Sequence, residues 1–151
     1  AEAITSAEAL LRRAPDDATA SAALATWLTD AGGEERRRTA AVGLLRRLSK
    51  LPAPLAASLE ASLNAPPTVR LSAAEALLAR DPDHAGASEA ILRLLLDGGV
   101  EPVHRSAASA PLSRLGATPK PLADALTAAA KEPDPETKER ARAALSLRGL
   151  P

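Results

Sequence analysis

The sequence feature that most constrains the fold is an internal repeat. When the chain is aligned with a copy of itself so that Glu8 lies on Glu75, nearly half of the positions in residues 8–67 are identical to their new partners. Such agreement over most of a chain indicates that similar units follow one another. Because the repeat covers almost the whole sequence, residues 1–151 are predicted to form a single domain.

The repeat that puts Glu8 on Glu75 divides into two shorter periods of nearly equal length. The residues that mark the division are Val69, Val103 and Thr137, which follow one another at a constant interval. This interval falls within the range of roughly 20–50 residues that is typical of arrays in which similar units stack and bury a continuous core. The repeat therefore predicts a stack of short, similar units.

The spacing of the apolar residues within each period predicts helices. Ile91, Leu94 and Leu95 follow the i, i+3, i+4 rule of an amphipathic helix, as do Ala141 and Ala144 with the leucine after them. Residues that favour strands are scarce, and Phe and Tyr are absent. Helices are therefore predicted at about 2–13, 18–30, 35–49, 53–64, 68–80, 85–97, 101–115, 119–131 and 135–148.

Turn residues separate these predicted helices. Asp134 precedes Pro135 and Thr118 precedes Pro119, which predicts a capping side chain followed by proline at the first helical position. Glycines close other helices at Gly32-Gly33, Gly98-Gly99 and Gly116. Further cap candidates, each close behind a proline, are Asp16, Asp17 and Asp83.

Three segments begin a repeat in the same way, with a turn followed by Ala and Leu at helical spacing: Pro67–Leu77, Asp97–Ala108 and Asp134–Leu145. They resemble HEAT repeats, and most of all the short bacterial kind first noted in phycobilisome lyases. That family places a Val-Arg pair after an Asp-Pro turn. Val69-Arg70 matches the pair in full, whereas Val103-His104 and Thr137-Lys138 depart from it. The resemblance implies an all-α, right-handed α-solenoid of about four and a half HEAT-like helix pairs, in a family whose members mostly bind proteins and in a few cases act on DNA or bilins.

The charge balance and the termini narrow the class of partner. The chain has 19 basic and 19 acidic residues and no net charge, which gives no electrostatic case for nucleic acid or an acidic membrane surface. No apolar run approaches the length of a membrane span, and Ala1–Ile4 lacks the basic region of a signal peptide. These features predict a cytoplasmic monomer with a protein or peptide partner, no membrane contact and no nucleic acid.

Basic side chains recur at one position, or next to it, in successive repeats: Arg36, Arg70, His104 and Lys138. One hypothesis is that this row of cations binds an acidic peptide or a phosphate chain. The alternative is that each cation bonds the aspartate of a neighbouring turn, for which Asp30 and Asp97 are suitably spaced. The single tryptophan, Trp27, replaces the Leu94 of the matching repeat and is either a core residue or part of a binding surface.

The predicted helix at 101–115 departs most from its repeat partners. Pro111 stands where matching helices carry Leu44 and Leu77, and small side chains surround it. His104 lies about one turn from Ala108 and two turns from Pro111 and Leu112 on the same face. The hypothesis is a cavity beside the imidazole that admits a flat cofactor, even a haem held by one axial histidine. The alternative is that small residues simply let neighbouring helices approach.

No catalytic set is visible in the sequence, so an enzyme is not the expected class. Cysteine is absent, and the two histidines with carboxylates alone give no metal-site pattern. Three hypotheses for function remain: a non-enzymatic binding or scaffolding module, a natural or engineered small-molecule or cofactor pocket beside His104 and Pro111, and a designed or consensus repeat scaffold without biological function.

Overall fold

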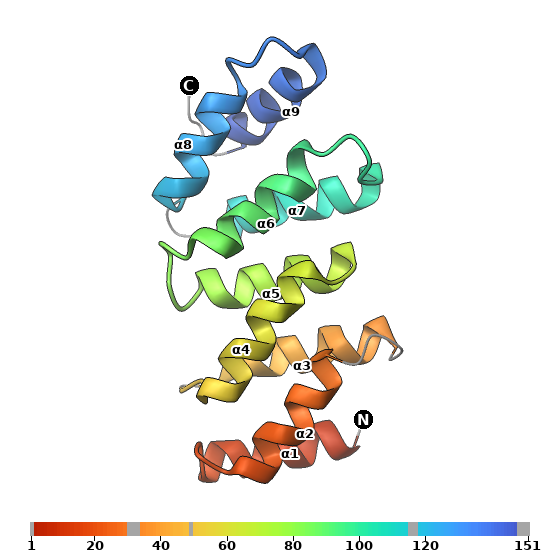
Figure 1. The fold of residues 1–151 in the computed structure, drawn as a ribbon, viewed down its shortest axis with the longest axis vertical. Helices are drawn as coiled ribbons and strands as arrows, with labels where there is room; N and C mark the ends of the chain where they lie inside the picture. The colour runs from red at the N-terminus through yellow and green to blue at the C-terminus, as the bar shows by residue number, and fades with distance from the viewer. Residues whose placement is uncertain (1, 30–33, 49, 115–117, 148–151) are drawn as a thin grey trace. The chain divides into compact units, whose positions relative to one another are not determined.

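The computed structural model describes residues 2–29, 34–48, 50–114 and 118–147. Over these residues the chain forms nine α-helices, one short 3-10 helix and no strand, which confirms the all-α prediction (Figure 1). The helices are α1 (Glu2–Arg13), α2 (Ala18–Thr29), α3 (Glu35–Arg47), α4 (Ala53–Ala61), η1 (Ser62–Asn64), α5 (Pro67–Leu78), α6 (Ala85–Leu96), α7 (Pro102–Arg114), α8 (Lys120–Ala129) and α9 (Pro135–Ser146).

Every predicted helix is present, and its ends lie within two residues of the prediction once η1 is counted as the last turn of α4. The predicted apolar faces are also confirmed. Ile91, Leu94 and Leu95 of α6 are buried, and α9 buries Ala141 and Ala144 together with the leucine that follows.

Two of the predicted caps are found. The carboxylate of Asp134 accepts a hydrogen bond from the backbone N–H of Thr137 at 2.8 Å and begins α9. The carboxylate of Asp17 accepts one from the N–H of Ala20 at 2.8 Å, at the start of α2. Both satisfy a donor that the first turn of a helix leaves without an intrahelical partner.

Two other cap predictions are wrong. Residue Pro119, rather than Thr118, is the N-cap of α8 and makes no side-chain cap, because the helix begins one residue later than predicted. His84, rather than Asp83, is the N-cap of α6, and its Nδ1 accepts from the N–H of Ala87 at 3.1 Å. Asp83 belongs to the preceding turn, where its own N–H donates to the carboxylate of Asp81. In both helices the N-cap is therefore the last residue of the preceding turn, one residue later than predicted.

The helices fall into two compact units, Ala1–Ala76 and Leu77–Pro151. In the first unit α2 packs against α1, α3 and α4. In the second unit α6 packs against α7, α8 and α9, and α8 packs against α9. Each unit is thus organised around one central helix that contacts three others. The prediction of one repeat domain over residues 1–151 stays a prediction.

Leucine and alanine make the core of both units. The fully buried alanines, at 0% exposure, include Ala41 of α3 and Ala73, Ala74 and Ala76 of α5. Such small side chains let helix axes approach closely, and neighbouring leucines fill the remaining space. Among the largest fully buried side chains are Leu24, Leu28, Leu44 and Leu55 in the first unit and Ile91, Leu94, Leu112 and Leu122 in the second.

Two glutamates at matching positions of the long repeat link the odd-numbered helices of the first unit. Glu8 of α1 pairs with Arg47 of α3 at 3.1 Å, and Glu75 of α5 pairs with Arg46 of α3 at 3.6 Å. The glutamate side chains are only 14% exposed, while the arginines are about half exposed or more. Because the arginines remain solvated, these pairs contribute little to the free energy of unfolding. They show that α3 lies beside both α1 and α5.

Candidate functional site

The repeating cations align when residues are counted from the start of each odd-numbered helix. The fourth residues of α3, α5, α7 and α9 are Arg38, Arg70, Arg105 and Lys138. Each of these residues donates its backbone N–H to the carbonyl four residues earlier, immediately before the helix begins. The row is therefore basic throughout. Arg36 lies two residues before Arg38, and His104 lies one residue before Arg105.

Three of these cations bind backbone carbonyls in the preceding turn or helix end. The Nε of Arg38 donates to the carbonyl of Leu28 in the last turn of α2 at 3.1 Å. Arg70 donates from Nε to the carbonyl of Ala65 at 3.2 Å. In α7, Nη2 of Arg105 donates to the carbonyl of Val100 at 2.8 Å. Carbonyls at helix ends lack intrahelical donors, so a guanidinium there both satisfies them and complements the helix dipole.

Aspartate was the acceptor proposed in the alternative interpretation of the cation row. Asp97 accepts a hydrogen bond from the N–H of Gly99 at 2.8 Å and so shapes its own turn. Asp30 lies outside the described residues, as do Gly32, Gly33 and Gly116. For the three arginines, the bonds that the structure gives run to backbone oxygens.

A local signal in the sequence marks this row. Pro67, Pro102 and Pro135 are each the first residue of a helix, and each stands three residues before a cation of the row. A proline is favoured at that position because the first helical N–H has no partner to lose. Counting from these prolines finds Arg105, whereas a strictly constant repeat interval selects its neighbour His104.

Arg36 lines an open cleft that is larger than the two other hollows described below. This open cleft, of about 420 Å³, lies between α3 and the start of α5, within the first unit. Its other lining residues are Glu35, Thr39, Ala40 and Thr68. Trp27 is only partly buried on α2, while Leu94, its repeat partner on α6, is completely buried.

The four residues predicted to hold a cofactor lie on α7. Ala108 and Leu112 are both 0% exposed and belong to the core of the second unit. His104 is partly exposed, and its Nε2 lies 4.0 Å from the carboxylate of Glu101. The backbone of Pro111 is part of α7, and its side chain lies outside the described part of the structure. The cofactor prediction for these residues stays a prediction.

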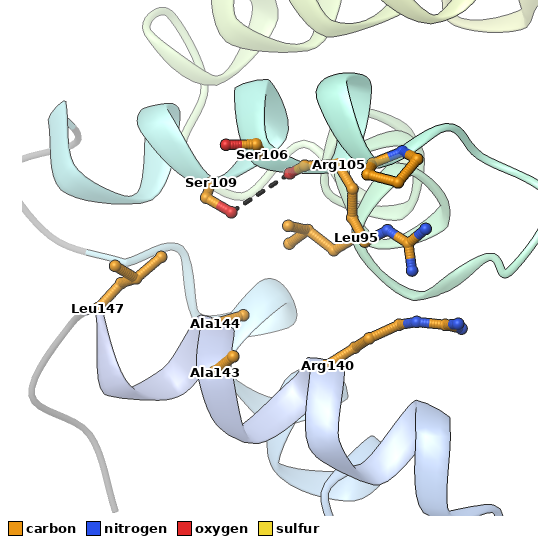
Figure 2. Close-up of a pocket in the computed structure, with 9 residues that line it drawn as sticks. Leu95, Arg105, Ser106, Ser109, Arg140, Ala143, Ala144 and Leu147 are labelled. Atoms are coloured by element: carbon orange, nitrogen blue, oxygen red, sulfur yellow. Dashed lines mark hydrogen bonds between the residues drawn. The ribbon is translucent and has the colours of Figure 1, made fainter.

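A second hollow, of about 240 Å³, lies between α7 and α9 in the second unit (Figure 2). The small side chains that set α7 apart do border a hollow here, on the face that carries Ser106 and Ser109. Figure 2 shows the side chains of Arg105 and Arg140 reaching the same end of this groove. The lining residues are Leu95, Pro102, Arg105, Ser106, Ser109, Arg140, Ala143, Ala144 and Leu147.

The third hollow, also of about 240 Å³, lies beside Arg38 in the first unit. The residue is 8% exposed, which makes it the one strongly buried cation of the described chain. Leu28 and Thr29 of α2 line the hollow together with Ser62, the first residue of η1, and Ala65, the residue that follows η1. Its polar groups are largely those that hold the ends of these helices in place.

The carboxyl of Asp134 is the group with a clear pKa shift that bears on the site helices. Hydrogen bonds from Thr137, first from its side chain and then from its backbone N–H, lower the pKa of Asp134 below its ordinary value. The deprotonated carboxylate is the better acceptor at a helix start, so this shift reflects the capping of α9.

Comparison with protein-family models, curated proteins and solved structures gives no match. Among the residues that the structure describes, no three side chains of metal-binding type come together. None of the described helices combines the length and apolar character needed to cross a membrane. The clefts and their arginines therefore carry the functional argument.

Proposed function

We propose that this chain is a non-enzymatic binding module, a right-handed α-solenoid of about four and a half HEAT-like helix pairs whose surface takes a protein or peptide partner. Short turns join successive helices, which favours antiparallel pairs. In support of stacking, α2 contacts α4 and α6 contacts α8, as equivalent helices of neighbouring repeats do in such arrays.

The observation that carries this proposal is the cleft beside Arg36. It is open to solvent, and its walls are the first turns of two neighbouring odd-numbered helices. Sites for small molecules usually enclose most of the ligand, whereas an open cleft suits a polypeptide that continues beyond it. The hydroxyls of Thr39 and Thr68 supply donors and acceptors for a backbone.

The charge of α3 favours an acidic occupant. The helix carries five arginines and one glutamate among its 13 residues. Arg36 and Arg37 are exposed at its start, and Arg46 and Arg47 are exposed at its end. Arg36 lines the cleft itself, while the other three pair with glutamates. Rim charges of one sign speed association with a partner of the opposite sign and fix its orientation.

A labelled acidic peptide of alternating Glu, Ala and Asp residues tests the proposal. Binding to the full chain is measured by fluorescence anisotropy, and its position is mapped by amide chemical-shift changes. We expect the changes to centre on Glu35, Arg36 and Thr68, with an affinity that falls as salt is added.

Arg36→Gln should weaken this binding about tenfold, which corresponds to about 1.4 kcal/mol. The matched control is Arg93→Gln, which removes an exposed arginine that pairs with Glu89 on α6 and belongs to the second unit. Equal losses in the two variants, or shift changes that avoid the cleft, would refute the assignment of the cleft as the binding site.

A further inference from the structure

We propose that the groove between α7 and α9 binds the C-terminal residue of a partner polypeptide. The free carboxylate would lie at Arg105 and Arg140, and an aliphatic side chain would lie against the apolar wall. This inference rests on the proposed function of a polypeptide-binding module, but it concerns a different unit and a different set of residues.

The cationic end of the groove has donors to spare. Arg105 donates one bond from Nη2 to the carbonyl of Val100, and its Nε is buried, so the donors left for a ligand are the remaining N–H groups of its two terminal nitrogens. Arg140 donates from Nη1 to the carbonyl of Leu96 at 3.1 Å. Each guanidinium carries five N–H donors, and a carboxylate accepts two of them side by side. A terminal carboxylate fits this end of the groove and would meet unused donors there.

Two carboxylates of the chain, Asp134 and Glu136, already interact with Arg140. Glu136 accepts from Nη2 of Arg140 at 2.7 Å, and its side chain is 74% exposed. Because the Glu136 side chain is largely in solvent, its pair with Arg140 contributes little and can be exchanged for another carboxylate. Asp134 is exposed as well, and its carboxylate is bonded to the backbone of Thr137, so a partner's carboxylate competes at Arg140 with two solvated groups and at Arg105 with a backbone carbonyl.

The other end of the groove is apolar and lined with small residues. Leu95 of α6 and Ala144 of α9 are buried, and Leu147 is 51% exposed at the rim. In Figure 2 the side chains of Leu147 and Ala144 lie across the groove from Ser109. An aliphatic side chain placed here covers Leu147 and removes apolar surface from water, which favours binding.

A comparison of matching helix positions explains why this hollow exists. The fifth residue of α5 is Leu71, and the fifth residue of α7 is Ser106. The ninth residue of α5 is Glu75, which pairs with an arginine of α3, and the ninth residue of α9 is Ala143. The groove thus has small residues at positions where α5 carries a bulky side chain and a carboxylate.

The size of the groove fits one amino-acid residue. Its volume of about 240 Å³ equals that of roughly eight waters at about 30 Å³ each. A terminal leucine or valine with its carboxylate has about that many non-hydrogen atoms. Ser106, Ala143 and Leu147 are exposed, so the groove is open on one side and the preceding residues of a partner can leave through it.

The first experiment compares two fluorescein-labelled peptides of sequence Gly-Ser-Gly-Ser-Ala-Leu on the full chain, one with a free C-terminal carboxylate and one amidated. We expect the acid to bind at least tenfold more tightly than the amide. Hexanoate is added as a competitor. Equal binding of acid and amide would overturn the proposal, and hexanoate that binds as tightly as the peptide would assign the groove to free carboxylic acids instead.

Variants then locate the site. Ser106→Leu introduces the residue that α5 carries at this position and should abolish acid binding by filling the groove. Arg105→Gln should reduce it at least tenfold, although it also loosens the bond to Val100, so Ser106→Leu is the decisive variant. The control Ala128→Leu adds the same kind of bulk at an exposed position of α8. Thermal melts confirm folding, and wild-type affinity in Ser106→Leu would refute the site.

The two proposals fail separately. Arg36→Gln should leave unchanged the binding of the Gly-Ser-Gly-Ser-Ala-Leu peptide with a free C-terminal carboxylate, because Arg36 lies on α3 in the other unit. If the peptide of Glu, Ala and Asp fails to bind at the α3 cleft while the C-terminal carboxylate still binds between α7 and α9, only the proposed site at the α3 cleft is refuted. If the C-terminal carboxylate fails to bind while the peptide of Glu, Ala and Asp still binds, only the groove between α7 and α9 is refuted as a site.

Discussion

Two valines at matching repeat positions provide a sharp test of the structure. Val69 and Val103 correspond to each other in successive repeats, yet Val69 is 0% exposed and Val103 is 64% exposed. If the repeat alone determined burial, Val69→Ala and Val103→Ala would destabilise the chain equally. The structure predicts a large loss for Val69→Ala and almost none for Val103→Ala.

The expected free-energy changes follow from burial. Replacing a buried valine by alanine removes two carbon groups, worth about 1.6 kcal/mol in transfer at about 0.8 kcal/mol each. An unfilled cavity of about 40 Å³ adds about 1 kcal/mol, and the better helix propensity of alanine returns about 0.5 kcal/mol. Val69→Ala should therefore cost about 2 kcal/mol. For Val103, only about a third of the transfer term applies, and helix propensity cancels it.

Far-UV circular dichroism during heating measures both variants, since it follows helices in both units. A cost of about 2 kcal/mol lowers the midpoint by about 4–8 °C in a chain of this length. Trp27 lies in the first unit with Val69, so its fluorescence in urea gives a second measurement for that variant. Equal midpoint changes for the two variants would refute the burial that the structure assigns to them.

Three further outcomes are expected. Pro111→Leu restores a helix hydrogen bond, which returns about 3 kcal/mol, and its added bulk costs about 1–3 kcal/mol if the helices are closely packed there, so the net gain is at most about 2 kcal/mol and the melting midpoint should rise by no more than about 8 °C; a larger rise would favour a cavity beside His104. Added haem should give no absorbance shift, because Ala108 and Leu112 are fully buried, and a shift that His104→Ala abolishes would contradict this. The Asp134 cap should stabilise α9 fully at pH values above the ordinary carboxyl pKa, and this stabilisation should be lost as the pH falls through the lowered pKa of the native state; amide exchange measures it. Asp134→Asn cannot titrate and should lack this loss at acid pH, so an identical pH profile for the variant and the wild type would count against the cap.

The helices were predictable because each is specified by residues close together in the chain. In α9, Asp134 caps the helix, a proline occupies its first position, and Ala141 and Ala144 mark the buried face. Capping and helical spacing act within a few residues, so they can be recognised in the sequence without any knowledge of the fold.

The candidate sites were predictable only in part. The sequence identified α7 as the helix with unusual small residues, and Arg36 as a member of a basic row. It did not identify Arg140 as a wall of the groove, because that side chain reaches the carbonyl of Leu96, far earlier in the chain. Contacts over such a separation depend on how helices pack, and no local pattern encodes them.

The repeat by itself determined that the chain forms helices at regular intervals, but not how each helix is rotated about its axis. Since α5 begins at Pro67 and α9 at Pro135, a strictly regular repeat starts α7 midway between them, at Glu101, whereas the helix begins at Pro102. Each residue of a helix turns by about 100°, so a shift of one residue redirects every side chain. This shift exposes Val103 and brings Arg105 into the basic row. The proline at the start of α7 marks this shift in the sequence, but only the packing of the helices decides that Val103 is left exposed while Val69 is buried, because burial depends on which helices lie against each face.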